Sequence, residues 1–185
     1  MLLPKCVRVD AHDKQSARAL KSDDWRRIGK LNEYRGKVNV REPEFVGEVE
    51  RGGDRAWILE AVPRFDFKGR LWRDKSIPIE DAIDETRRFI GEARDHHLFH
   101  IPHKGFMICR GHGGWGVSGK KPMRIQLIGV LERRSGVGRR LVEAAAVYYR
   151  NDFFVAGTYS DNESAKSLYL SLPLSLVGAY EVFHK

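Results

Sequence analysis

Glycines and arginines gather in one short turn between an apolar stretch and a helical pattern. The apolar stretch, residues 124–131, is rich in β-branched side chains, and apolar residues then recur at helical spacing from Leu141 to Ala146. Gly136 and Gly138 have no Cβ, so a ligand can approach the backbone closely at both positions. The first amides of the following helix lack intrahelical partners and lie at the positive end of its dipole. This combination predicts a binding site for an anion such as a diphosphate.

The order of Arg133, Gly136 and Gly138 in this turn matches neither a P-loop nor a dinucleotide fingerprint. The P-loop needs Gly-Lys followed by Ser or Thr, and the fingerprint needs three glycines. The order instead resembles the acyl-coenzyme A signature of the GNAT superfamily: Gln or Arg, two residues, Gly, one residue, then Gly or Ala. The resemblance implies that the turn and the strand before it hold acetyl-coenzyme A. The residues assigned to this co-substrate are Ile128, Val130, Arg133, Arg134, Ser135, Gly136, Val137, Gly138, Arg139 and Arg140.

A second segment resembles the closing motif of the same superfamily. After a predicted strand at 153–159, Asn162, Ala165 and Tyr169 match the pattern Asn, two residues, Ala, three residues, Tyr. Apolar residues of this segment fall on one helical stripe, for which burial is the simpler explanation. The stripe comprises Ala165, Leu168, Tyr169 and Leu172.

This resemblance implies functional roles for Tyr169 and Asn162. The family places the tyrosine at the cofactor thiol. A phenol of pKa about 10 is protonated at neutral pH, so Tyr169 can donate a proton to the leaving thiolate. Packing in the core is the alternative explanation for Tyr169. Asn162 is predicted to cap the helix, and the resemblance adds a contact to the pantetheine or diphosphate arm of the cofactor.

The resemblance also implies a fold and a reaction. The fold is a mixed α/β GNAT fold, with a central, mostly antiparallel sheet that is flanked by helices and splayed at the acyl-coenzyme A site. The reaction is direct transfer of an acetyl or other short acyl group to a primary amine. Scattered residues from Arg64 to Pro78, and Tyr180 near the end, resemble GNAT enzymes that acylate nucleotide-linked amino-deoxysugars of the dTDP-fucosamine type. A protein amine, a polyamine or another small amine is the alternative acceptor.

Composition favours one domain over residues 1–185, with 42% apolar residues to form its core. No apolar run reaches the roughly 18 residues of a membrane span, and the apolar start is too short for a secretory signal. Two cysteines, Cys6 and Cys109, fit a reducing cytoplasm and are expected to be buried apolar residues.

The net charge of +8 fits a phosphorylated cofactor and a nucleotide-linked substrate. A basic nucleic-acid-binding module is a further alternative. Homodimers are common in the GNAT superfamily, so the resemblance implies a homodimer as one expected assembly.

The remaining pattern predicts the elements around these motifs. Strands are expected at 6–9 and 106–109, and Asp10 or Asp13 is expected to cap a helix. Further predictions are a helical piece at 23–31, a hairpin at 45–62 and a helix at 79–96. A polar connection is expected at 63–76, and a glycine-rich loop at 111–122.

Histidines and acids offer no clear general base. His96 and His100 have the i,i+4 spacing that can bind a metal on a helix, but the sequence supplies no acidic or cysteine partner, so no metal is expected. The strand before the turn has no acidic residue. Glu132 lies on the turn itself and is expected to face solvent.

Overall fold

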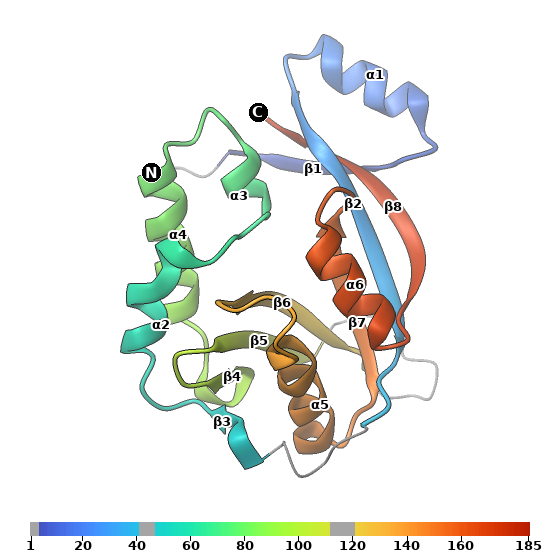
Figure 1. Cartoon of the computed structure of the whole chain (residues 1–185). Coiled ribbons are helices and arrows are strands. Elements are labelled where there is room, and N and C mark those ends of the chain that lie inside the picture. Colours follow the sequence, from blue (N-terminus) through green and yellow to red (C-terminus); the bar gives the residue numbers. More distant parts are fainter. Residues whose placement is uncertain (1–3, 41–46, 112–120) are drawn as a thin grey trace.

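The structure, a computed structural model, describes residues 4–40, 47–111 and 121–185. Eight strands form one sheet in the order β1-β8-β2-β7-β6-β5-β4-β3 (Figure 1). The strands are β1 (Cys6–Asp10), β2 (Arg26–Lys37), β3 (Glu50–Arg51), β4 (Leu98–Ile101), β5 (Gly105–Gly111), β6 (Met123–Val130), β7 (Phe153–Tyr159) and β8 (Ser175–His184). Neighbouring strands are antiparallel except β6 and β7, which are parallel. This agrees with the predicted mixed α/β fold and its mostly antiparallel sheet.

Helices cover both faces of the β3–β6 half of the sheet. The helices of the described residues are α1 (Lys14–Ser22), α2 (Ala56–Ala61), α3 (Arg70–Arg73), α4 (Ile79–Gly91), α5 (Val137–Tyr149) and α6 (Glu163–Ser171), with short 3₁₀ helices η2 (Val62–Arg64) and η3 (Asp95–His97). Of these, α2, α4 and α5 lie against the β3–β6 half. Because strand residues alternate between faces, Phe99 and Met107 join the core under α5, whereas Leu98 and Phe106 join the core under α2 and α4. None of the described helices is long and apolar enough to cross a bilayer.

Several predicted elements are confirmed. The strands predicted at 6–9, 106–109 and 153–159 are β1, β5 and β7, and the strand–turn–helix around Gly136 is β6 followed by α5. Asp13 caps α1, since its side chain accepts from the Ser16 amide at 3.0 Å. Asn162 caps α6 in the same way, through the Ala165 amide at 3.3 Å. These elements have local signals that suffice to define them.

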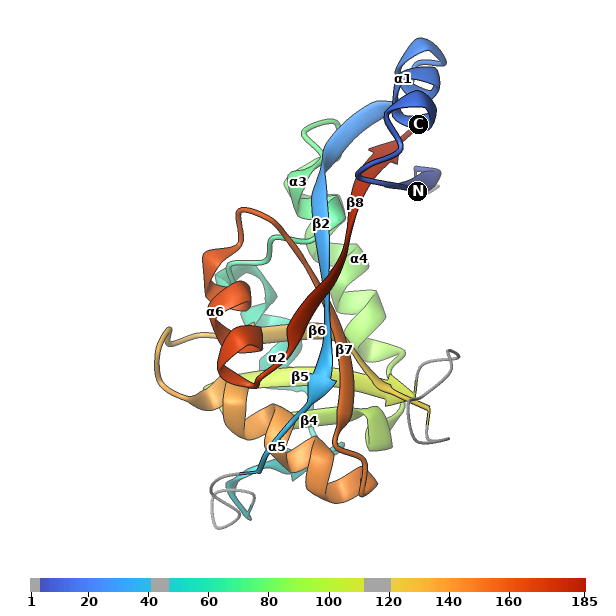
Figure 2. The same cartoon turned by 90° about the vertical axis from the view of Figure 1, so that its right-hand side faces the viewer.

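The helical piece predicted at 23–31 is wrong, because β2 occupies Arg26–Lys37. This strand from the beginning of the chain lies between β7 and β8, which come from its end. It pairs with β8 from Arg26 onward and with β7 from Leu31 onward. Hydrogen bonds along both edges outweigh a weak local helical preference. Figure 2 shows β2 and β8 as a long twisted pair that leads to α1.

The hairpin predicted at 45–62 is also wrong. Residues 45–46 lie outside the described residues, and the expected second strand is the helix α2, which buries Ile58 and Ala61. A short apolar run does not distinguish a strand from a buried helical turn. The connection at 63–76 contains α3. The helix expected over 79–96 ends at Gly91.

Candidate active site

The parallel strands β6 and β7 pair over a short distance and then separate. Their paired residues are 123–125 on β6 and 154–156 on β7. On the opposite edge of β6, the partners of two consecutive β5 residues change from Leu127 to Ile125, which leaves Gln126 as an extra residue. A bulge of this kind increases the local twist and redirects the strand. Beyond the paired residues β6 and β7 run in different directions (Figure 2), so the sheet is splayed between them.

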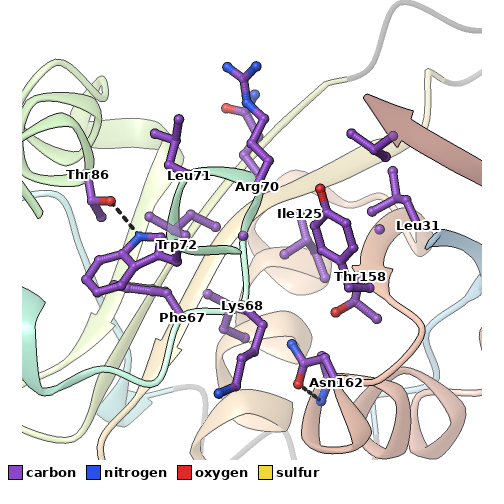
Figure 3. A pocket seen from close by; sticks show the side chains of 18 of the residues that line it. Leu31, Phe67, Lys68, Arg70, Leu71, Trp72, Thr86, Ile125, Thr158 and Asn162 are labelled. Atoms are coloured by element: carbon purple, nitrogen blue, oxygen red, sulfur yellow. Dashed lines mark hydrogen bonds between the residues drawn. The ribbon is translucent and has the colours of Figure 1, made fainter. Parts of the chain in front are cut away.

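A cavity of about 410 Å³ lies beside the splay (Figure 3). Its walls come from β6, β7 and α6, from the segment 66–72 with most of α3, from α4, and from β1 and β8. The Trp72 indole donates to the Thr86 hydroxyl at 3.1 Å, which holds this segment against α4. Figure 3 shows Lys68 and Arg70 extending from the same segment, with Thr158 and Asn162 on the other side of the cavity.

The glycines of the turn have two different structural roles. Gly136 is the N-cap of α5 and has a φ of 77°, a left-handed conformation that favours glycine. Gly138 lies within the first turn of α5, where an added Cβ would lie 3.1 Å from Leu168 Cδ2 and 3.7 Å from Ile128 Cδ1. No side chain caps this helix and its first turn contains no acid. The first amides of α5 therefore have no side-chain cap among the described residues, and the anion site at this turn stays a prediction.

The arginines of the turn are largely engaged with acids. Arg133 pairs with Asp66. Arg139 donates to the buried Glu143 at 2.8 Å, and Arg140 donates to Glu48 at 2.7 Å. A diphosphate at this turn would thus meet backbone amides directly, and it would meet these three guanidiniums only after they share or exchange their carboxylate partners.

The other residues assigned to the co-substrate lie close to this turn. Ile128 lines the cavity, and Val130 ends β6 opposite Gly105. Ser135 donates through its hydroxyl to the carbonyl of Glu132 at 2.7 Å. Arg134 has a φ of 62° and is exposed, and Val137 is buried in the core. Glu132 is exposed, as predicted.

Tyr169 on α6 and Asn162, the N-cap of α6, both line the cavity. Tyr169 is 3% exposed, lines the cavity and packs against the Tyr34 ring at a centroid distance of 5.5 Å. Burial raises the pKa of its hydroxyl above the ordinary value, and Tyr34 adds to this shift. The phenol is therefore protonated at neutral pH. Asn162 combines its capping role with a place in the cavity wall.

Arg8 and Tyr159 also line the cavity, although neither was assigned a role from the sequence. Arg8 lies on β1, and Tyr159 ends β7 three residues before the motif asparagine. Burial raises the pKa of the Tyr159 hydroxyl to about 12 and the Cys6 thiol adds to this, whereas the guanidiniums of Arg73, Arg8 and Arg70 oppose it. Three cations therefore lie within electrostatic range of one hydroxyl. The position of Tyr159 at a strand end was the available signal, and Arg8 offered none.

Asp74 anchors the α3 segment to the end of the sheet. Its carboxylate, 2% exposed, contacts Nδ1 of the fully buried His184 at 2.7 Å. It also accepts from Arg26 at 2.7 Å and from the Ser76 hydroxyl at 2.8 Å. Burial acts to raise the pKa of this carboxyl, but hydrogen bonds led by that of His184 outweigh it and lower the pKa to about 2. This buried cluster fixes one wall of the cavity in place.

The histidines and cysteines contribute little to this cavity. His96 lies in η3 and His100 in β4, so the predicted helical spacing between them is wrong. The His100 ring is 2.8 Å from the Gly52 carbonyl. Cys109 is buried as expected, and burial raises the pKa of its thiol. Cys6 is only half-buried and lines the cavity, contrary to the expectation of a core residue. The glycine-rich loop at 112–120 lies outside the described residues.

Comparisons with known proteins show the fold. No family model matches the chain, and no curated protein matches its sequence. A functionally unknown conserved protein of Staphylococcus epidermidis is 13% identical over 96% of this chain, with a TM-score of 0.60. A GCN5-related N-acetyltransferase from Sphaerobacter thermophilus is 16% identical over 97%, with a TM-score of 0.56.

A third similar structure is the glucosamine N-acetyltransferase region of a fungal multi-domain GH3 β-N-acetylglucosaminidase. It is 12% identical over 98% of this chain, with a TM-score of 0.61. The chain spans 69%, 58% and 25% of the lengths of these three proteins, in the order given. At these identities the similarity concerns the fold, and that fold is the one found in GNAT acetyltransferases.

Proposed function

We propose that this chain transfers an acetyl or other short acyl group from acyl-coenzyme A directly to a primary amine. One observation carries the proposal: the cavity lies where two parallel strands separate and is lined by the buried Tyr169, while one of these strands, β6, leads directly into the uncapped start of α5. The fold shared with GNAT acetyltransferases supports the same reaction.

The residues of the turn fit a phosphorylated co-substrate. The amides that open α5 would hold its diphosphate, because no acid in the first turn repels an anion and Gly136 adds no side chain. Arg133, Arg139 and Arg140 surround this helix start and add positive charge, even while paired. Asn162 would contact the arm of the co-substrate from the start of α6.

Tyr169 would act as the general acid of the transfer. The leaving thiolate needs a proton, and a phenol that remains protonated at neutral pH can supply it. The backbone near Val130 would donate to the thioester oxygen as negative charge develops there. The amine loses its proton to water, since the two carboxylates among the described lining residues, Asp66 and Glu85, are both ion-paired.

The acceptor we favour is an amine on a nucleotide-linked amino-deoxysugar. The segment 66–72, part of the region that resembles the sugar-modifying enzymes, forms one wall of the cavity. The fold accommodates aminosugars, because one of the similar structures is named for glucosamine N-acetylation. A protein amine, a polyamine or another small amine is the alternative.

A transfer assay tests both the acyl transfer and the choice of acceptor. Release of free coenzyme A from acetyl-coenzyme A is measured with a dTDP-linked amino-deoxysugar, with spermidine and with a lysine-containing peptide. We expect turnover with the nucleotide sugar and little with the others. Turnover restricted to the peptide or to spermidine would contradict the acceptor, and no turnover or binding of acetyl-coenzyme A at all would contradict acyl transfer.

A further inference from the structure

Positive charge in the cavity exceeds the acids that could balance it. Two carboxylates line the cavity, and each has a partner: Asp66 pairs with Lys68 at 2.6 Å, and Glu85 pairs with Arg88 at 2.6 Å. By contrast, no carboxylate among the described residues pairs with Arg8 or Arg70, and both line the cavity. Uncompensated guanidiniums on a concave wall attract anions and increase their local concentration.

Arg8 and Arg70 come from segments far apart in the chain, and the fold brings both segments to the same cavity. Arg70 lies in α3 and Arg8 in β1. Both charges act on the Tyr159 hydroxyl, and Tyr159 lines the same cavity. An anion bound in this cavity would be attracted by both guanidiniums, because no carboxylate of the described residues pairs with either.

A third arginine, Arg73, packs against Tyr159 at the same cavity. The Arg73 guanidinium lies over the Tyr159 ring, 4.6 Å from its centroid, and donates to Asp161 at 2.8 Å. Gly29 makes room for this stack, because an added Cβ would lie 2.9 Å from the ring. Asp74 follows directly and fixes the end of α3 through His184. Arg70 is therefore presented by an anchored segment, which lowers the entropic cost of binding.

We propose that Arg8 and Arg70 form an oxyanion subsite that binds a phosphate or carboxylate group of the acceptor. The guanidinium fork matches both groups in bidentate geometry. This inference rests on the proposed acyl transfer and narrows its acceptor to amines that carry such an anion. Acceptors without one lack this contact and bind more weakly.

Small oxyanions test the subsite without knowledge of the acceptor. Pyrophosphate and malonate are titrated by calorimetry into protein saturated with coenzyme A, so that the turn before α5 is already occupied. We expect saturable binding of at least one probe, and weakening of about tenfold or more in Arg8→Gln and in Arg70→Gln. Tighter binding of pyrophosphate would identify a phosphate acceptor, and tighter binding of malonate a carboxylate acceptor.

Arg64→Gln is the matched control, because Arg64 is exposed in η2, near α3 in the chain, and does not line the cavity. The Arg64→Gln variant should bind the probes with the same affinity as the unchanged protein. Equal affinities in Arg8→Gln, Arg70→Gln and the unchanged protein would overturn the subsite, even if acyl transfer is found. Binding that depends on Arg70 in a protein that fails to bind coenzyme A would retain the subsite and remove the acyltransferase proposal.

Discussion

The two walls of the cavity are built in different ways. We call β6 and α6, which line the cavity, together with the turn and α5, which pack beside them, the donor wall. The acceptor wall comprises β1, β8 and residues 66–74. The donor wall is formed by residues 123–171, interrupted by β7 alone. The acceptor wall unites segments from the beginning, middle and end of the chain, and Asp74 and His184 join two of them in a buried contact.

The walls also differ in the groups that they offer to a ligand. On the donor wall, Arg133, Arg139 and Arg140 are held by carboxylates, and the free groups are backbone amides. On the acceptor wall, Arg8 and Arg70 have no such partners among the described residues. The donor wall should therefore be sensitive to changes that block the backbone, and the acceptor wall to changes in side-chain charge.

The largest effect is expected from Gly138→Phe on the donor wall. Even a Cβ at this position would be 3.1 Å from Leu168, so a phenyl ring must displace α6 or occupy the ligand path. We expect loss of measurable acetyl-coenzyme A binding, followed by calorimetry on folded protein. Gly91→Phe is the control, since nothing lies within 4 Å of an added Cβ there. An unchanged affinity in Gly138→Phe would remove the turn from the donor site.

Asp74→Asn tests the anchor of the acceptor wall. The substitution removes the carboxylate to which buried His184 and Arg26 are hydrogen-bonded, at an expected cost of about 2 kcal/mol in the free energy of unfolding. Denaturant unfolding measures this change. Asp84→Asn is the control, because Asp84 is exposed and forms a weaker pair with Arg87 at 3.3 Å, so its loss should cost less than about 0.5 kcal/mol.

The pH dependence of stability sharpens the same test. The pKa of Asp74 is lowered from 3.8 to about 2, so its carboxylate stabilises the fold above pH 3.8. This contribution, about 2 kcal/mol, is lost as the pH falls through about 2. The difference between the unchanged protein and Asp74→Asn should therefore shrink from pH 4 downward. A difference that stays constant over this range would show that the ionised carboxylate of Asp74 does not stabilise the anchor.

Tyr169→Phe separates chemistry from packing on the donor wall. The phenyl ring keeps the contact with Tyr34, while the proton donor is lost. We expect kcat to fall by about 100-fold, with little change in the affinity for acetyl-coenzyme A or in thermal stability. Tyr148→Phe, an exposed position on α5, serves as the control. Undiminished turnover would leave Tyr169 with a packing role alone.

The smallest effect is expected from Arg133→Gln. Its side chain is 64% exposed and already pairs with Asp66, so it adds little to a ligand that the amides hold. Affinity for acetyl-coenzyme A should fall by about threefold at low salt, and the difference should disappear at high salt. A loss of affinity comparable to that of Gly138→Phe would mean that the donor wall binds acetyl-coenzyme A through side chains. The proposed difference between the two walls would then be wrong.

The sequence predicts the donor wall well because its signals are local. Gly136, Asn162 and the stripe ending at Leu172 each act within a few residues, through a backbone conformation, a cap or a helical period. The acceptor wall depends on pairing between distant segments. The insertion of β2 between β7 and β8, and the presence of Arg8 and Arg70 in one cavity, have no local signature.

Titration with acetyl-coenzyme A tests the central claim most directly. Calorimetry at moderate salt suppresses nonspecific binding of anions to this basic chain. The account predicts saturable binding at one site, which is lost in Gly138→Phe and retained in Gly91→Phe. Absence of saturable binding, or equal binding in both variants, would contradict a donor site at the start of α5.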